Sequence, residues 1–308
     1  DVYLDNKKAV LPYETSFSSK KLWQFREKAP DFTIALGSCA YISEEALDRP
    51  GKPYGSNYSI FESIAKKNPD IMIWGGDNIY LREADWDSKT GIHHRYTYSR
   101  KIKETQSLLA KTQNFAIWDD HDFGPNDGDR GFYYKYETQQ AFKDFWANKS
   151  YGMNPNQKEG IYSCFNWGDA EVFLLDNRFF RSPNDRLTGD KVLLGKTQIE
   201  WLIDALVTSK ASFKIIVIGG QVLSSAAVFE NYENYKTKNS NNDKTYFEIA
   251  NSSVRYNKKN SPLTFEIFVN NIFDTKTKNN ISISDLIISE STTYILPRVV
   301  MLSLTYKI

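Results

Sequence analysis

The chain has 308 residues, of which 41% are hydrophobic and 25% are charged, and its formal net charge is +1. These values are typical of a folded protein with one large or two modest domains. The near-neutral charge provides no general attraction to nucleic acid or to anionic membranes. No stretch approaches the roughly 20 apolar residues of a membrane span. The two cysteines, Cys39 and Cys164, are too few for a disulfide framework.

Apolar segments alternate with amphipathic segments along the first two-thirds of the chain. After an aperiodic, extended lead-in, buried strands are expected at residues 32–39, 71–80, 114–122, 170–180 and 213–222. Helical spacing of apolar residues predicts helices at residues 58–70, 95–112 and 195–210. This alternation is typical of layered α/β folds with buried strands.

Residues whose side chains could bind a ligand or take part in catalysis lie toward the C-terminal end of each predicted strand segment. They are Cys39, Asp77, the run Asp119–His121, Asp176 and Gln221. In α/β sheets, binding sites form beyond the carboxyl ends of the strands. The repetition of this pattern at five strands therefore predicts a single polar site at that edge.

Asp77 and Cys39 each allow two interpretations. Asp77 follows two glycines, which permit a sharp turn and a close approach to a ligand, and Tyr80 comes three residues later. The two oxygen donors could bind one hard cation, or Asp77 could cap a helix beside a core tyrosine. Cys39 is either a small buried residue or, at a strand end, a thiolate that binds a transition metal.

The segment 116–130 contains five aspartates and one histidine. A calcium-binding EF-hand requires an acid at position 5 and Glu at position 12 of its loop, but a loop that starts at Asp120 has Gly124 and Gly131 there. A solvated acidic loop and a cation site remain as alternatives. His121, beside acids at a strand end, suits general acid or base chemistry.

Arginines follow the fourth predicted strand, in the segment "LLDNRFFR". Arg178 and Arg181 could bind phosphate through their guanidinium groups, or they could form surface ion pairs. The carboxylates, phenol, thiol, imidazole and guanidinium groups together favour metal-assisted hydrolysis of an anionic ester. The loops 81–100 and 123–136 are expected to shape the pocket, whereas His93 and His94 are better explained as surface residues.

Five ordered motifs resemble the PhoD-type alkaline phosphatase family, which belongs to the calcineurin-like metallophosphoesterase superfamily. They are "GSC" at 37–39, "GDNIY" at 76–80, "WDDHDFGPND" at 118–127, "LLDNRFFRSP" at 174–183 and "LLGKTQIEWL" at 193–202. The resemblance implies an α/β fold of four layers, in which two mixed β-sheets lie between helices, and it implies hydrolysis of phosphate monoesters or diesters. Small-molecule or lipid phosphate esters would be the substrates, and a periplasmic or extracellular location would be typical.

The same resemblance suggests roles for individual residues. Fe3+ would be bound by Cys39, Asp77 and Tyr80, with Ca2+ beside it. Asp77 and Asp120 would face the second metal. His121 would hydrogen-bond the phosphate or protonate the leaving group. Arg178, with Asp176, would either contact the phosphate or support the ligands.

The other aspartates of the acidic segment are expected to play supporting roles. Asp119 and Asp122 would act through hydrogen bonds. Asp127 and Asp129 lie beyond the Gly-Pro turn, in a loop.

The resemblance divides the chain into a lead-in at 1–30, a metallophosphatase core at 31–235 and a divergent Asn/Ser/Lys-rich segment at 236–308. The family closes its site with a later Gly-Asp-x-His motif, but no histidine follows His121. Either divergence or a shifted reading frame would produce this change. Two other functions therefore stand beside hydrolysis: a degenerate protein that binds phosphate esters or metal, and a calcium-stabilised structural module. The module leaves Cys39, Tyr80 and His121 unexplained.

Overall fold

A computed structural model describes most of the chain. The described residues are 3–10, 13, 19, 21–48, 50–51, 57–152, 159–186, 188–221, 252–257, 262–271, 277–283, 288–294 and 298–306. The chain divides into two compact units, Asp1–Tyr232 and Glu233–Ile308.

The first sheet of the larger unit is parallel. Its strands, in spatial order, are β3 (Ile34–Gly37), β4 (Ile71–Gly75) and β5 (Gln113–Ile117). The central strand β4 is a continuous apolar run in which Ile71 is fully buried and Trp74 is 5% exposed. Such a run is expected for a parallel strand that is covered on both faces.

The second sheet is mixed. It contains β6 (Ser163–Trp167), β7 (Ala170–Leu174) and β8 (Phe213–Val217); β6 is antiparallel to β7, and β8 is parallel to it. Val172 and Leu174 join the core that includes the first sheet. Phe173, on the opposite face, contacts Trp201 of helix α6 (Lys196–Thr208), with ring centroids 6.4 Å apart. The two-residue period of a strand thus directs alternate side chains to the other sheet and to α6.

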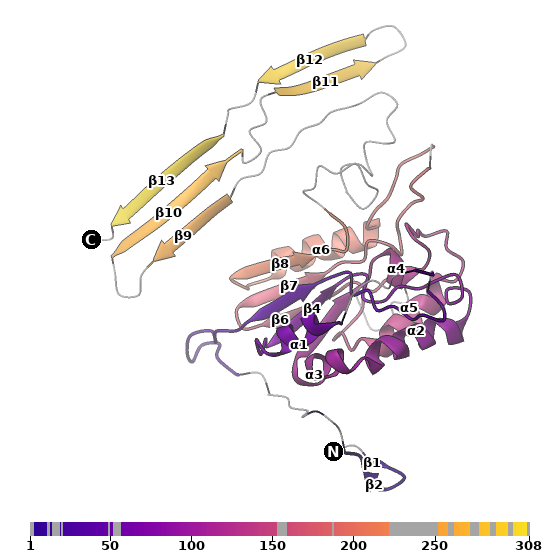
Figure 1. Cartoon of the computed structure of the whole chain (residues 1–308). Coiled ribbons are helices and arrows are strands. Elements are labelled where there is room, and N and C mark those ends of the chain that lie inside the picture. Colours follow the sequence, from indigo (N-terminus) through magenta and orange to yellow (C-terminus); the bar gives the residue numbers. More distant parts are fainter. Residues whose placement is uncertain are drawn as a thin grey trace. The chain divides into compact units, whose positions relative to one another are not determined.

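The other helices among the described residues of the larger unit are shown in Figure 1. They are α1 (Ser59–Ala65), α2 (Lys89–Lys101), α3 (Lys103–Lys111), α4 (Asp120–Phe123) and α5 (Lys135–Phe145). Trp74 of β4 contacts Phe61 of α1 at 6.0 Å and Trp146 at the end of α5 at 5.4 Å between ring centroids. Phe115 of β5 stacks on Phe165 of β6 at 3.6 Å, so the two sheets share one core.

The remaining strands lie near the two ends of the chain. A short antiparallel pair, β1 (Tyr3–Leu4) and β2 (Lys7–Lys8), lies in the lead-in. In the second unit, β9 (Ser252–Asn257), β10 (Leu263–Asn270) and β13 (Val299–Tyr306) form one antiparallel sheet, and β11 (Thr277–Ile283) pairs with β12 (Ile288–Tyr294).

The α/β class is confirmed, but several predicted element boundaries are wrong. The strand expected at 114–122 ends at Ile117, and the acidic residues after it form the short helix α4. The helix expected at 95–112 is divided into α2 and α3 by Ile102, whose ψ of 122° is extended. Helix α5 and strand β6 were not predicted from the sequence. Within the part of the chain that is described, no helix has the length and apolarity needed to cross a membrane.

Candidate metal centre

The parallel order of the first sheet brings three predicted segments to one edge. Because β3, β4 and β5 run in the same direction, the residues that follow them lie beside one another. Backbone hydrogen bonds join these loops: the Cys39 amide donates to the Gly76 carbonyl at 3.0 Å, and the Leu81 amide donates to the His121 carbonyl at 3.1 Å. The predicted gathering of strand ends is therefore observed for these three strands.

Two of the predicted ligands have a strained backbone. Cys39 and Asp77 have φ angles of 58° and 53°, in the left-handed region that residues other than glycine seldom adopt. Gly76 precedes Asp77 with a φ of 103°, and a Cβ atom built on it would lie 2.9 Å from Cβ of Asp119. The glycine thus permits the close approach of the β4 and β5 loops. Strain of this kind is concentrated at functional sites.

The side chains that follow β4 and β5 form a compact cluster. Asp77, Asp120 and His121 each place one potential ligand atom within 4.8 Å of the others. The Tyr80 hydroxyl donates to Oδ2 of Asp77 at 3.2 Å, and the Cys39 thiol lies 3.9 Å from the same oxygen. The structure therefore brings together five of the six predicted site residues, namely Cys39, Asp77, Tyr80, Asp120 and His121.

The positively charged groups of the protein do not fully compensate the carboxylates of this cluster. Burial raises the pKa of Asp77 to about 9, and the neighbouring carboxylates of Asp122 and Asp120 add to this effect. Burial also opposes ionisation of Asp120, but Arg178 and His121 hold its pKa below the ordinary value. A bound cation would remove the repulsion around Asp77, so the donor set fits a metal ion.

The other three side chains are uncharged in the absence of a cation. Burial lowers the pKa of His121, an effect that Asp120 partly opposes, so its imidazole is neutral near pH 7. Burial raises the pKa of the Cys39 thiol, and both burial and the Asp77 carboxylate raise the pKa of Tyr80. Neither group would ionise at neutral pH without a metal ion.

Arg178 lies behind the cluster. Its side chain is 0% exposed, and its Nε donates to Oδ1 of Asp119 at 2.5 Å, while Nη2 lies 3.8 Å from Oδ1 of Asp120. Asp176 is also fully buried and accepts hydrogen bonds from the Trp118 indole at 2.7 Å and from backbone amides. Of the two predicted roles for Arg178, this position favours support of the acidic residues.

Hydrogen bonds with backbone amides connect the other aspartates of the acidic segment to the cluster. Asp122 accepts from the amides of Asn78, at 3.0 Å, and Asp119, at 3.2 Å, and burial raises its pKa to about 8. The Asp127 amide donates to Asp120 at 2.6 Å. Asp119 and Asp122 both accept hydrogen bonds, and their support of Asp120 and His121 stays a prediction. Asn78 was not predicted; its side chain also donates to the Ile117 carbonyl at 2.7 Å, and its place within "GDNIY" was the available signal.

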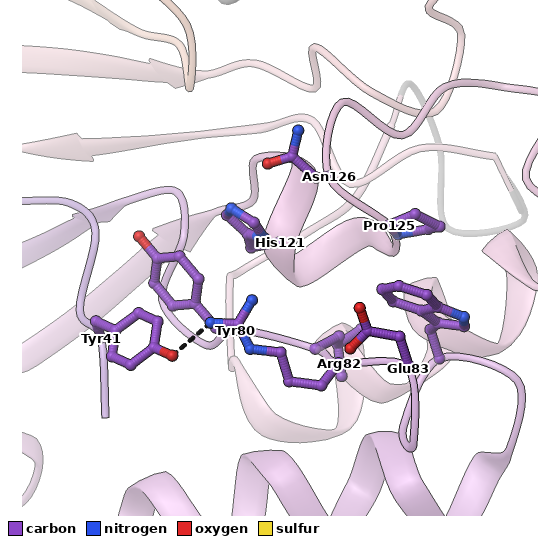
Figure 2. Close-up of a pocket in the computed structure, with 9 residues that line it drawn as sticks. Tyr41, Tyr80, Arg82, Glu83, His121, Pro125 and Asn126 are labelled. Atoms are coloured by element: carbon purple, nitrogen blue, oxygen red, sulfur yellow. Dashed lines mark hydrogen bonds between the residues drawn. The ribbon is translucent and has the colours of Figure 1, made fainter. Parts of the chain in front are cut away.

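A pocket of about 830 Å³ opens beside His121 (Figure 2). Its lining consists of Tyr41, Tyr80, Leu81, Arg82, Glu83, Trp86, His121, Pro125 and Asn126. The loops predicted at 81–100 and 123–136 both contribute residues to this pocket, but residues from Lys89 onward form helix α2 and not a loop, and Tyr41 was not predicted. His93 and His94 lie on α2 and contact Asp144 at 3.1 Å and Glu44 at 2.9 Å, as expected for surface histidines.

The fold and the cluster define an α/β protein with a carboxylate-rich candidate metal centre at the carboxyl edge of a parallel sheet. The sequence profile of the PhoD-like phosphatases matches residues 34–261. The chain therefore belongs to the PhoD-like phosphatase family. No curated protein has significant sequence similarity to it.

The solved structures that are similar in part include two phosphatases. PhoD is 19% identical with a TM-score of 0.49, over 61% of this chain and 41% of PhoD. A purple acid phosphatase from seeds of yellow lupin (Lupinus luteus) is 12% identical with a TM-score of 0.43, over 64% of this chain and 31% of that protein. The chain thus spans less than half the length of either protein.

Proposed function

We propose that this chain hydrolyses phosphate esters at a metal centre beyond the carboxyl ends of β3, β4 and β5. The observation that carries the proposal is the meeting of Asp77, Asp120 and His121, with ligand atoms within 4.8 Å of one another, in a member of a phosphatase family. The surrounding fold would be the four-layered sandwich of two mixed sheets between helices. Its core would span 31–235, between a lead-in at 1–30 and a divergent segment at 236–308.

The donor chemistry supports a centre with two kinds of metal. Cys39, Asp77 and Tyr80 would hold Fe3+, because the 3.2 Å and 3.9 Å contacts place a phenol and a thiol on the same carboxylate. Asp77 and Asp120 would face Ca2+, which prefers carboxylate oxygens. Metals held there would supply an activated water nucleophile.

The protein's own side chains would bind and protonate the substrate. His121 lines the pocket, and its neutral imidazole can hydrogen-bond a phosphate oxygen or deliver a proton to the leaving oxygen. Arg178 would hold Asp119 and Asp120 in place from behind. The substrate would be a small-molecule or lipid phosphate ester, and the protein would act in the periplasm or outside the cell.

Turnover of p-nitrophenyl phosphate by protein supplied with iron and calcium tests this function. We expect hydrolysis that a chelator stops and that the double variant Asp77→Ala, His121→Ala lacks. The variant Arg26→Ala, which replaces an exposed residue, is the control. A wild-type rate no higher than that of the double variant would contradict hydrolysis.

The identity of the first metal has a separate test. An Fe3+–phenolate centre has an absorption band in the visible range, so the iron-loaded protein should be coloured. Tyr80→Phe should abolish this phenolate band. Tyr136→Phe, which alters an exposed tyrosine, should leave it unchanged. A band that persists in Tyr80→Phe would exclude Tyr80 as the iron ligand.

A second candidate function is the binding of phosphate esters without turnover. The observation that supports it is the cluster of Asp77, Asp120 and His121, because a metal ion held there could bind a phosphate ester without hydrolysing it. Calorimetry on the metal-loaded protein distinguishes the two functions. Binding of p-nitrophenyl phosphate without release of p-nitrophenol would favour this candidate, and release would exclude it.

A further inference from the structure

Arg82 is held rigidly at the wall of the pocket beside His121. Its side chain is 11% exposed, and its Nε donates to Oδ1 of Asp48 at 3.2 Å. Its Nη2 donates to the Tyr41 hydroxyl at 2.5 Å. The guanidinium carbon lies 5.1 Å from the Tyr41 ring centroid and 5.6 Å from that of Tyr80. These contacts fix the orientation of the guanidinium group.

One end of this fixed guanidinium group is open to the pocket. Nη1 has no hydrogen bond to any residue that the structure describes, whereas Nε and Nη2 are both bonded. Figure 2 shows Nη2 at Tyr41 and the other terminal nitrogen directed toward His121. Arg82 is also the only lysine or arginine in the described lining of the pocket.

The pocket is larger than a phosphate group requires. Its volume of about 830 Å³ lies within the range of sites that enclose whole organic ligands. The rings of Tyr41, Tyr80 and Trp86 form part of its wall. Aromatic walls of this kind favour a flat, apolar group. The site therefore offers one fixed cation, close to His121, and an aromatic surface beyond the candidate metal centre.

We propose that Arg82 binds an anionic oxygen of the phosphate ester through Nη1, and that Tyr41 and Trp86 receive a planar, apolar alcohol group. This assignment rests on the proposed phosphoesterase function and specifies its substrate class as esters of aromatic or similarly flat alcohols. Asp48 and Tyr41 position Arg82; Arg82 itself contacts the substrate.

Steady-state kinetics of Arg82→Ala with p-nitrophenyl phosphate tests the first part of the assignment. Loss of one charge-assisted hydrogen bond should raise KM by about 10-fold or more and change kcat by less than about 3-fold. Metal content should equal that of the wild type. Arg82→Lys keeps the charge but loses the planar guanidinium group. Its KM should lie between those of the wild type and Arg82→Ala. Arg26→Ala, which removes an exposed arginine, should match the wild type.

Trp86→Ala tests the second part. KM for p-nitrophenyl phosphate should rise by about 5-fold or more, while KM for glycerol phosphate, whose alcohol is small and polar, should change by less than about 2-fold. Equal changes for both esters would contradict the aromatic preference. If Arg82→Ala does not fold, Arg82→Lys and Tyr41→Phe carry the test, and both should raise KM at unchanged metal content.

The results also separate this assignment from the proposed function. Wild-type turnover with an unchanged KM in Arg82→Ala would overturn the role of Arg82 and leave the phosphoesterase function standing. Without wild-type turnover, hydrolysis fails, and the affinity of the metal-loaded protein for p-nitrophenyl phosphate becomes the measure. In that case an affinity about 10-fold lower in Arg82→Ala than in the wild type would support the contact between Arg82 and the ester, and equal affinities would overturn it.

Discussion

Asp77 combines backbone strain with electrostatic repulsion. Its φ is 53°, and burial together with Asp122 and Asp120 raises its pKa to about 9. Both features reduce the stability of the metal-free protein. A cation at Asp77 and Asp120 would offset the repulsion, which explains why a sequence would retain so many carboxylates in a buried position.

The raised pKa of Asp77 predicts a pH dependence of stability. In the metal-free protein, the folded state binds more protons than the unfolded state between the unfolded pKa of about 4 and the folded pKa of about 9. The contribution of Asp77 to stability is therefore present below about pH 4 and is lost as the pH rises toward 9. Because a metal displaces this proton, its stabilising effect should grow over the same range.

Thermal unfolding between pH 5 and pH 9, with chelator and with iron plus calcium, measures this effect. The Tm with iron plus calcium should exceed the Tm with chelator by an amount that grows as the pH rises. Asp77→Asn should abolish most of this growth. A difference that is independent of pH in the wild type would contradict the proposed role of Asp77.

The Arg178–Asp119 pair should contribute strongly to stability. Arg178→Ala would leave Asp119 buried without its cation, which typically costs about 3–5 kcal/mol. Arg255→Ala breaks the 3.0 Å pair with Glu266, in which Arg255 is exposed, and should cost at most about 1 kcal/mol. Denaturant unfolding compares the two variants. Similar losses would show that Arg178 does not stabilise the acidic residues.

The types and positions of the candidate ligands could be predicted from sequence, but their neighbours could not. Cys39, Asp77 and His121 were predictable because each follows an apolar strand. The unpaired Nη1 of Arg82 was not, because it depends on Asp48 and Tyr41, which are 34 and 41 residues away in the chain. Local spacing contains no information about such contacts.

The short, tightly turned connections that follow the strands of the first sheet determine where the side chains of the candidate metal centre lie. Element types were predictable from a continuous apolar run, as in β4, or from a helical period of apolar residues, as in α6. Boundaries at the site were not, because the chain leaves β5 at Ile117 and turns into α4 in order to pack on the β4 loop. The hydrogen bond from the Asn78 amide to Asp122 supports that turn and is a tertiary contact, whereas the bond from the Asp119 amide to Asp122 is a local cap of α4.

Gly76→Ala tests the importance of the β4 connection. The new Cβ would lie 2.9 Å from Cβ of Asp119 at a positive φ, so the loop must shift and carry Asp77 with it. We expect a loss of about 1–3 kcal/mol in stability and weaker metal binding. Gly51→Ala also introduces Cβ at a positive φ, but with no atom within 4 Å, and should cost less and leave metal binding unchanged. Equal effects would contradict a specific role for Gly76.

At the scale of the whole molecule, the larger unit contains every candidate ligand, and most described residues of the second unit are in strands. The composition of the last 73 residues, from 236 to 308, predicted a change of character but not antiparallel sheets. Alternation such as "ISIS" at 281–284 is a strand signal, yet polar residues dilute it. Pairing partners far apart in the chain, such as β10 and β13, cannot be deduced from such a pattern.

The central claim is that the carboxyl edge of the first sheet binds metal ions. Elemental analysis tests it most directly, after loading with iron and calcium and removal of free ions, in the wild type and in Asp77→Ala. The wild type should retain about one iron and about one calcium per chain, and Asp77→Ala should retain little of either. A wild-type protein without bound metal, or a variant with equal metal content, would contradict the claim.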